Sequence, residues 1–347
     1  MVPRRWIASL AVDPVRALER IVYLLDRAGA DRFRVQAYRG AADTVRALPG
    51  DELARLVAEG RLETLPGVGP KTAAVIQEAL AGETPSYLQT LEGTTGVRAQ
   101  EGDRLQAMLR GDCHTHSEWS DGGASIEEMA LAARALGHEY LALTDHSPRL
   151  TVARGLSRER LEQQLDLVAG LNERLAPFRI LTGIEVDILE DGSLDQDDDL
   201  LVRLDVVVAS VHSKLRMAER EMTRRMCTAV ANPHVDILGH CTGRLVTGKR
   251  GRPESTFDAE LVFHACERFD TAVEINCRPE RLDPPRRLLR LAIEMGCRFA
   301  IDTDAHAPGQ LEWQAYGCDR AVECGVDPDR VINIWPAADL VAWAASR

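Results

Sequence analysis

The stretch RGDCHTHSEWSDGG, residues 110–123, places two histidines two positions apart at the end of a short apolar run, with an aspartate five positions later. Side chains two positions apart in a strand lie on the same face, so His114 and His116 would share one face. The stretch therefore predicts a strand that delivers two imidazoles to one site, with Asp121 close behind.

Six further short apolar runs rich in strand-forming residues follow, and they alternate with stretches of helical periodicity. They are EYLALTDH (139–146), FRILTGIEVDI (178–188), LDVVVASVH (204–212), VDILGH (235–240), TAVEIN (271–276) and RFAIDTDAH (298–306). Seven strands that alternate with helices predict an α/β fold with a parallel sheet, and over roughly 240 residues a closed, seven-stranded (β/α)7 barrel is the economical architecture.

Six of these seven runs have His, Asp or Glu at or near their last residue. The carboxyl ends of barrel strands converge on one mouth, so these side chains would meet there. Imidazoles and carboxylates that converge without a cation would leave buried charge and unmatched acceptors, at a cost of several kcal/mol, so we expect a metal cluster. The expected catalytic metal ligands are His114, His116, Asp121, His146, Glu185, His212, His240, Asp304 and His306. Cys113 and Cys241, each next to a ligand, should point elsewhere.

Composition limits the class of protein. The net charge is −12, with 13 Lys and Arg against 12 Asp and Glu in residues 1–100 and 29 against 42 in the remainder, which argues against bulk electrostatic coating of nucleic acid. The eight cysteines form no CxxC pair and are expected to be reduced thiols. No apolar run of about 18 residues and no secretory signal is evident, so we expect a cytoplasmic protein with no membrane association.

The amino-terminal part has a different pattern. Residues 13–92 have apolar positions at helical spacing only, which predicts a small all-α domain over residues 1–95, followed by a small polar linker at 96–105 and the barrel at 106–347. Within it, LPGVGPKTAAVIQEAL (65–80) has two glycines around an apolar residue before a helix. This pattern is typical of a helix-hairpin-helix turn whose backbone approaches a DNA phosphate, and it nominates Gly67, Gly69 and Lys71 as DNA contacts. A tight turn between two packed helices is the alternative.

The motifs HTHSEWSDG, TDH, GIEVDI, SVHS, ILGH and DTDAH resemble those of the polymerase and histidinol phosphatase (PHP) family of metal-dependent phosphoesterases over residues 110 to about 340. FRVQAYRGAADTVRALP and LPGVGPKTAAVIQEAL resemble the amino-terminal 8 kDa domain of family X DNA polymerases, whose bacterial members carry a carboxyl-terminal PHP domain. The chain thus resembles a bacterial family X polymerase without its catalytic palm and thumb.

The resemblance implies two to three divalent transition metals, Zn, Mn or Fe. One metal would take His114, His116, Glu185 and Asp304; a second Asp121, His146 and His306; a third His212, His240 and the bridging Glu185. Clustered cations lower the pKa of a bound water and stabilise charge on an in-line displacement at phosphorus. Apart from the resemblance, basic residues follow several of the predicted strands, namely Lys214, Arg216, Arg244, Arg278 and Arg281, and could bind the substrate phosphate. Ordinary surface placement is the alternative for each of them.

Two departures from family X limit what carries over. The lysine that forms a Schiff base in family members with deoxyribose phosphate lyase activity corresponds here to Val75, so we expect no lyase activity by that route. The polymerase carboxylates have no counterpart, so we expect no polymerase activity.

The sequence therefore predicts a hydrolase of phosphoester bonds, a DNA 3'-5' exonuclease or 3'-end-processing repair enzyme that acts on single-stranded or gapped ends beside a separate repair polymerase. A histidinol-phosphatase-like enzyme for a small phosphomonoester would use the same metal chemistry but has no need of a DNA-binding module. A non-catalytic DNA-repair scaffold is the third reading, against which nine intact ligand positions count.

Overall fold

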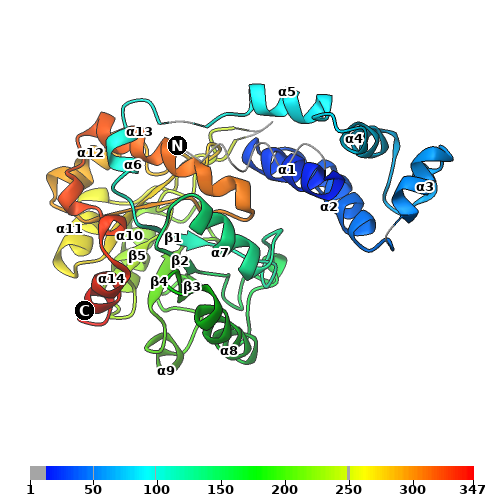
Figure 1. Ribbon diagram of the computed structural model, residues 1–347. Coiled ribbons are helices and arrows are strands. Elements are labelled where there is room, and N and C mark those ends of the chain that lie inside the picture. The colour runs from blue at the N-terminus through cyan, green and yellow to red at the C-terminus, as the bar shows by residue number, and fades with distance from the viewer. Residues whose placement is uncertain (1–12, 50, 98, 248–250) are drawn as a thin grey trace. The chain divides into compact units, whose positions relative to one another are not determined.

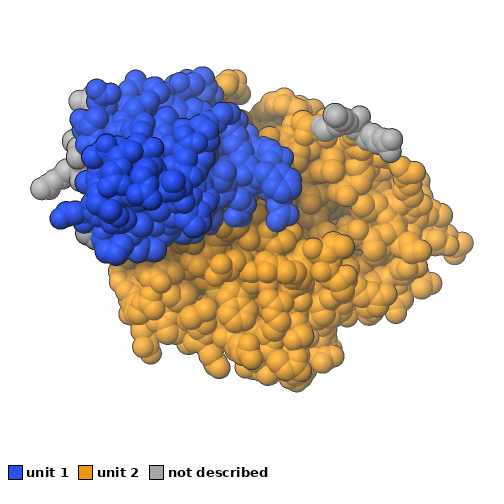
Figure 2. Space-filling model, turned by 90° about the vertical axis from the view of Figure 1, so that its right-hand side faces the viewer, with its two compact units in different colours: residues 1–97 blue, residues 98–347 orange. Residues whose placement is uncertain are grey.

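The computed structural model of the chain describes residues 13–49, 51–97, 99–247 and 251–347. They form two compact units that divide between residues 97 and 98 and are coloured separately in Figure 2. The segment before Asp13, where we expect no secretory signal, lies outside the described residues. Among the helices that are described, none has both the length and the apolar character needed to cross a bilayer.

Unit 1 is all-helical, as predicted. Its α-helices are α1 (Pro14–Arg27), α2 (Arg32–Arg46), α3 (Glu52–Ala58), α4 (Pro70–Leu80) and α5 (Ser86–Thr94). Helix α1 begins where the Asp13 carboxylate accepts a hydrogen bond from the Val15 amide at 2.9 Å. Its apolar stripe, including Leu18 and Ile21, packs with Ile76 of α4 in one fully buried core. The unit therefore has its own hydrophobic core.

Unit 2 contains a seven-stranded parallel sheet in sequential order, which confirms the predicted (β/α)7 barrel. The strands are β1 (Gly111–Thr115), β2 (Tyr140–Leu143), β3 (Arg179–Asp187), β4 (Val206–Ser210), β5 (Ile237–Leu238), β6 (Ala272–Asn276) and β7 (Phe299–Asp302). A parallel bridge between Thr115 and Ala305, with the His116 amide 2.8 Å from the Ala305 carbonyl oxygen, joins the first strand to the segment after the last. This contact nearly closes the barrel.

Helices surround the sheet in Figure 1. They are α6 (Asp103–Gln106), α7 (Ile126–Ala135), α8 (Arg158–Leu175), α9 (Asp198–Leu201), α10 (Glu219–Val230), α11 (Ala259–Arg268), α12 (Arg286–Glu294), α13 (Gln314–Cys324) and α14 (Ala337–Ala344). The strands supply apolar side chains to two clusters. Leu141 and Leu143 pack against α7 and α8, whereas Ala142, between them on β2, packs with Val208 of β4 in a separate cluster. This alternation explains why the strands are apolar along nearly their whole length.

The second half of the predicted linker belongs structurally to unit 2. The amides of Gln100, Glu101 and Gly102 all donate to Asp319 Oδ1 of α13, at 2.7, 3.0 and 2.8 Å. Gly102 lies so close to α13 that a Cβ there would be 2.6 Å from the backbone carbon of Cys318. The anchor is an aspartate more than 200 positions away, so composition could not reveal it.

Candidate metal centre

Glu185 of β3 is the centre of the site. Its carboxylate is fully buried and lies within 2.8–3.6 Å of ring nitrogens of five histidines from four other strand ends: His114, His116, His146, His212 and His240. Burial acts to raise the pKa of Glu185, but His114, His212 and His146 outweigh it and hold that pKa well below its usual range. The carboxylate is therefore an anion that faces several strands at once.

The remaining predicted residues join this centre from the loops after β1 and β7. Asp121 Oδ1 lies 3.2 Å from His306 Nε2 and 3.5 Å from His146 Nε2. Asp304 Oδ1 lies 3.4 Å from His116 Nε2. The structure thus brings all nine residues together, although they span 193 positions of sequence from His114 to His306.

Three groups of ligand atoms, each within 4.8 Å of one another, occur among the described residues. They are His116, Asp121, His146 and His306; His114, His116 and Glu185; and His146, Glu185 and His212. These groups overlap the three sets that the resemblance implies, but His116 and His146 are each shared between two groups. His240 and Asp304 stand outside the groups and contact them through Glu185 and His116.

The donor set fits divalent transition metals. Several buried atoms here have no hydrogen-bond partner, namely His114 Nε2, both ring nitrogens of His116, His146 Nδ1, His240 Nδ1 and Glu185 Oε2. Burial, together with His306 and His146, holds the pKa of His116 well below its usual range, which favours the neutral ring that binds metal. Buried polar atoms without partners are costly, and a cation would satisfy them.

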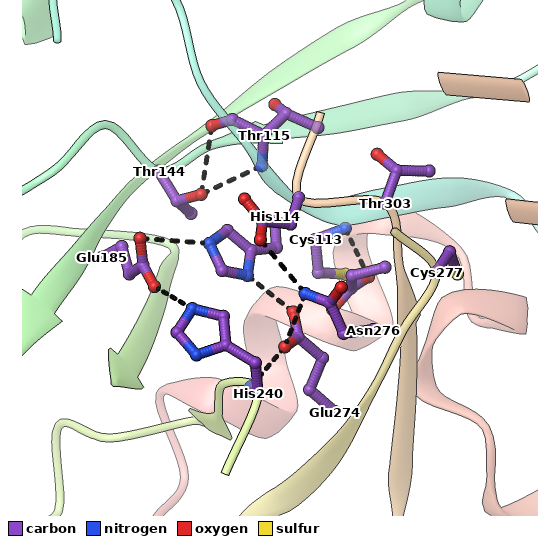
Figure 3. A network of polar contacts seen from close by, with 12 residues as sticks. Cys113, His114, Thr115, Thr144, Glu185, His240, Glu274, Asn276, Cys277 and Thr303 are labelled. Carbon is purple, nitrogen blue, oxygen red and sulfur yellow. Dashed lines mark hydrogen bonds and ion pairs between the residues drawn. The ribbon is translucent and has the colours of Figure 1, made fainter. Parts of the chain in front are cut away.

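Three residues that orient these ligands escaped the sequence analysis. Glu274 of β6 accepts from the His240 amide at 2.5 Å and lies 2.6 Å from His114 Nδ1, so the His114 ring sits between Glu185 and Glu274 (Figure 3). Asn276 Nδ2 donates to both Glu274 Oε2 and Asp304 Oδ2, each at 3.2 Å. Because Glu274 holds Nδ1, the His114 Nε2 atom is left to face Glu185.

Asp187 has the same function for His212, with Oδ1 2.8 Å from Nδ1. Both carboxylates carried a signal in the sequence. Asp187 follows Glu185 at the two-residue spacing that shares a strand face, and Glu274 is an acid within an otherwise apolar run, where it must have a partner.

The protonation of His114 shows what a cation would replace. Burial acts to lower the pKa of His114, but the carboxylates of Glu185 and Glu274 outweigh it and raise that pKa well above its usual range. Without a cation, the two carboxylates favour the protonated ring. His114 and Glu185 would be among the residues that hold a cation, and a bound cation would displace that proton.

The cysteines near the site point away from it. The Cys113 thiol packs with Tyr140 and Ala142, and the Cys277 thiol lies 3.4 Å from the Ile275 carbonyl oxygen. The Cys241 sulfur lies 3.9 Å from Asp283 Oδ1. No cysteine of the described chain joins the three ligand groups.

A cavity of about 430 Å³ opens beside the centre. Of the four predicted phosphate-binding residues, only Arg281 lines it, together with Arg278. Arg281 is largely buried, and its Nε and Nη1 atoms lack a hydrogen-bond partner, although Nε lies 3.3 Å from Asp304 Oδ2. The Arg278 guanidinium lies 3.3 Å from Asp304 Oδ1 and 3.1 Å from His306 Nδ1. Two guanidinium groups therefore face the candidate metal centre.

The other three basic residues lie elsewhere. Arg244 donates to the carbonyl oxygens of Arg281 and Leu282, so its guanidinium fixes the loop instead of facing the cavity. Lys214 and Arg216 are exposed on the segment after β4 and do not line the cavity. Position after a strand end predicted nearness to the mouth but not the direction of a long side chain.

The predicted DNA contacts Gly67, Gly69 and Lys71 lie at the turn before α4 and in its first turn. Gly67 has φ +74°, a conformation that favours glycine, and Gly69 is the residue before α4. The amide of Gly69 donates to Thr72 Oγ1 at 3.0 Å, that of Val68 to the Leu65 carbonyl at 3.2 Å, and Pro70 has no amide hydrogen. The amides directly after Gly67 and Gly69 are therefore not available to a phosphate.

Lys71 lines a separate cavity of about 290 Å³ within unit 1. Arg34, Tyr38, Val75 and Tyr87 also line it. Glu78 lines it too, so the concave surface carries two cations against one carboxylate and has a small positive charge.

Comparison with known proteins matches each unit to a known domain. The helix-hairpin-helix domain model matches residues 12–85 and the PHP domain model matches residues 112–276. The chain is 42% identical over 236 residues to the DNA polymerase/3'-5' exonuclease PolX of Bacillus subtilis, with 68% of this chain and 41% of that protein covered. It thus spans less than half the length of this relative.

Shorter relatives match as well. A protein named "Probable phosphatase" from Caldanaerobacter subterraneus is 30% identical over 216 residues, with 58% of this chain and 78% of that protein covered. The solved structure of a histidinol phosphate phosphatase from Lactococcus lactis, complexed with zinc, L-histidinol and phosphate, matches with 17% identity and a TM-score of 0.46, covering 63% of this chain and 95% of that one. From its motifs, its barrel and these relatives, the chain belongs to the PHP domain family and carries a helix-hairpin-helix domain ahead of the PHP domain.

Proposed function

We propose that this chain is a metal-dependent phosphoesterase that hydrolyses phosphoester bonds at DNA 3' ends, as a 3'-5' exonuclease or an end-processing enzyme. One observation carries the hydrolytic part: Glu185 faces five histidines in a buried centre where several ring nitrogens have no hydrogen-bond partner. Divalent cations held by the nine residues would supply hydroxide near neutral pH and stabilise charge at phosphorus.

The residues of the chain have distinct parts in this proposal. Glu274 and Asp187 hold the Nδ1 atoms of His114 and His212, so their Nε2 atoms, which face Glu185, would be free to hold a metal. Arg278 and Arg281 offer guanidinium groups to the phosphate oxygens, and the geometry of a guanidinium matches two such oxygens. Neither arginine moves a proton, because a guanidinium stays charged.

DNA as substrate is supported by the helix-hairpin-helix domain, by the weakly positive cavity around Lys71, and by the similarity to a protein named as a 3'-5' exonuclease. Single-stranded or gapped 3' ends and a separate repair polymerase as partner belong to the same proposal. We also propose a cytoplasmic location, supported by eight free cysteines. The nine predicted ligands remain part of the proposal.

A phosphatase of a small phosphomonoester is the second candidate, because several relatives are named "Probable phosphatase" and match the chain over 56–64% of its length. The decisive experiment compares substrates of the purified protein after it is loaded with Mn²⁺ or Zn²⁺. The substrates are histidinol phosphate and labelled DNA that is single-stranded, gapped or 3'-phosphorylated. Release of nucleotides or phosphate from DNA at a higher kcat/KM than from histidinol phosphate supports the proposal. The reverse order supports the small-molecule phosphatase.

A further inference from the structure

The cavity beside the metal centre has two chemically different walls. One carries seven of the nine predicted ligands, the guanidinium groups of Arg278 and Arg281, and the carboxylate of Glu280, which pairs with Arg278. The other is apolar and consists of Leu150, Val152, Ala153 and Leu245. Hydrolysis at a metal centre makes no use of this second wall, so its residues point to a part of the substrate other than the phosphate.

The apolar wall is unusual because its central side chain faces water. Val152, in the short helix η3 (Thr151–Ala153) after β2, is 90% exposed. Single exposed apolar residues are common on protein surfaces, but Val152 lines the cavity together with part-exposed Leu150 and Leu245 and buried Ala153, and such a group marks a binding surface. Leu245 comes from a different loop, after β5, so two loops build this surface.

The loop that presents Val152 is fixed at both ends. The Leu156 amide donates to the His146 carbonyl oxygen at 2.7 Å, which ties the loop to a predicted metal ligand. The Arg149 amide donates to Asp195 Oδ2 at 2.9 Å. Val152 is therefore held over the mouth before any substrate arrives, and little conformational entropy is lost on binding.

The turn after Val152 is built with unusual backbone geometry. Arg154 has φ +57°, a rare conformation for a residue with a side chain, and its guanidinium donates to the Glu118 carbonyl oxygen at 2.8 Å. A Cβ at Gly155 would lie 1.8 Å from the Ser147 carbonyl oxygen, so only glycine fits there. These contacts fix the position of the exposed valine.

We propose that this apolar wall binds the nucleobase of the 3'-terminal nucleotide, while the scissile phosphate faces the metal centre and Arg281. The proposal rests on the function proposed above and names the subsite that selects its substrate. A nucleotide joins an apolar-faced ring to an anionic phosphate through a sugar, which matches a cavity lined both by apolar side chains and by two guanidinium groups. The volume of about 430 Å³ is within the range of small-molecule sites.

The test uses two single-stranded oligonucleotides of identical sequence, one with a 3'-terminal thymidine nucleotide and the other with an abasic tetrahydrofuran nucleotide at that end. The scissile bond is the same in both. With Mn²⁺, the unmodified protein should remove the base-bearing nucleotide with a kcat/KM roughly 10-fold higher, a typical discrimination for a modest apolar contact. Val152→Asp should bring this ratio close to one by slowing only the base-bearing substrate.

The chain offers a matched control in Val202, which is 65% exposed and follows α9 away from the cavity. Val202→Asp should keep the preference of the unmodified protein, and so should Val152→Ile. An unmodified protein that treats both ends alike overturns the inference, as does a preference that survives Val152→Asp, and either result leaves the proposed DNA hydrolysis standing. Failure to cleave either oligonucleotide, with hydrolysis of histidinol phosphate intact, overturns the proposed function together with this inference.

Discussion

The two ends of the barrel bury charge in different ways. At the amino ends of β4 to β6, Asp236 accepts from the Val207 amide at 2.8 Å and pairs with Arg347 at 3.2 Å, and Arg347 also donates to Thr271 Oγ1 at 2.8 Å. At the carboxyl ends, Glu185 faces five histidines and several ring nitrogens have no partner. The amino-end groups named here have partners within the chain, whereas several atoms at the carboxyl end lack a hydrogen-bond partner that a metal ion would supply.

This contrast suggests that buried charges at one end of the barrel serve the stability of the fold and those at the other end serve its chemistry. Parallel barrels place catalytic side chains at the carboxyl ends of their strands and leave the amino ends to packing. Residues at the amino end should therefore change the free energy of unfolding but not metal binding. Residues at the carboxyl end should change metal binding and catalysis first.

The largest expected effect is at Glu185. Glu185→Ala removes the carboxylate shared by five histidines, and hydrolysis should fall by at least about 10³-fold because the centre can no longer hold its cations together. The measurements are kcat/KM on a 3'-end substrate and metal content per chain. Glu139→Ala is the matched control, since Glu139 is an exposed acid that precedes β2 at the amino end and pairs with Arg110. Full activity in Glu185→Ala would contradict the assignment of the chemistry to the carboxyl ends of the strands.

The next effect concerns Glu274. Glu274→Gln keeps the size of the side chain but replaces the carboxylate that holds His114, and metal affinity should fall about 10- to 100-fold. Metal titration of the protein, without any substrate, measures this directly. Asp187→Asn should have a smaller effect, because His212 is more exposed than His114. If Glu274→Gln bound metal with unchanged affinity, Glu274 would contribute to packing only.

The arginines at the mouth give a third test. Arg281→Ala should raise KM about 10-fold with a smaller change in kcat, since a charged hydrogen bond to phosphate is worth roughly 1.5–3 kcal/mol and part of it is made in the ground state. Arg244→Ala should instead lower the free energy of unfolding and raise KM less than Arg281→Ala does, because Arg244 donates to backbone carbonyls of the loop that carries Arg281. An equal rise of KM in both variants would mean that Arg244 also reaches the substrate.

The smallest effect on activity is expected at the amino end. Burial raises the pKa of Asp236 to about 7, with Arg347 opposing, from an ordinary value of 3.8. Because the folded pKa lies above the unfolded one, the unfolded chain loses this proton first as pH rises. The protein should therefore lose stability relative to Asp236→Asn between about pH 4 and pH 7, on the order of 1–3 kcal/mol, and show no further relative change above pH 7.

Urea unfolding of the unmodified protein and of Asp236→Asn at several pH values measures the difference in their free energies of unfolding. Metal content per chain is the control measurement. A difference that stays constant across this range would show that Asp236 is ionised throughout. A change in metal content would contradict the separation of the two ends.

Much of unit 2 could be predicted from the sequence because buried parallel strands are apolar along their length and their last residues stand out chemically. All seven strands fall within the predicted runs. The residues that escaped prediction depend on non-local geometry. Glu274 reads as one acid in a strand until His114 is placed beside it, and the attachment of Gly102 to Asp319 joins positions 217 apart.

The contacts of long basic side chains were also poorly predicted from the sequence. Arg244 and Arg281 occupy similar places in the sequence, after β5 and β6, yet only Arg281 lines the cavity. The direction of a guanidinium depends on which carbonyl oxygens lie within reach, and these come from a neighbouring loop. A basic residue that follows a strand can therefore be predicted to lie near the mouth of the barrel, but the contacts of its side chain cannot be predicted.

The bridge between Thr115 and Ala305 also bears on how the protein matures. The predicted ligands His116 and Asp304 flank this bridge, so the first and last strands must pair before these two side chains meet. Until β7 takes its place in the sheet, neither Asp304 nor His306 lies beside the residues of β1. Metal loading would therefore follow closure of the barrel, and a bound cation would join segments 188 positions apart and oppose the opening of the barrel at its seam.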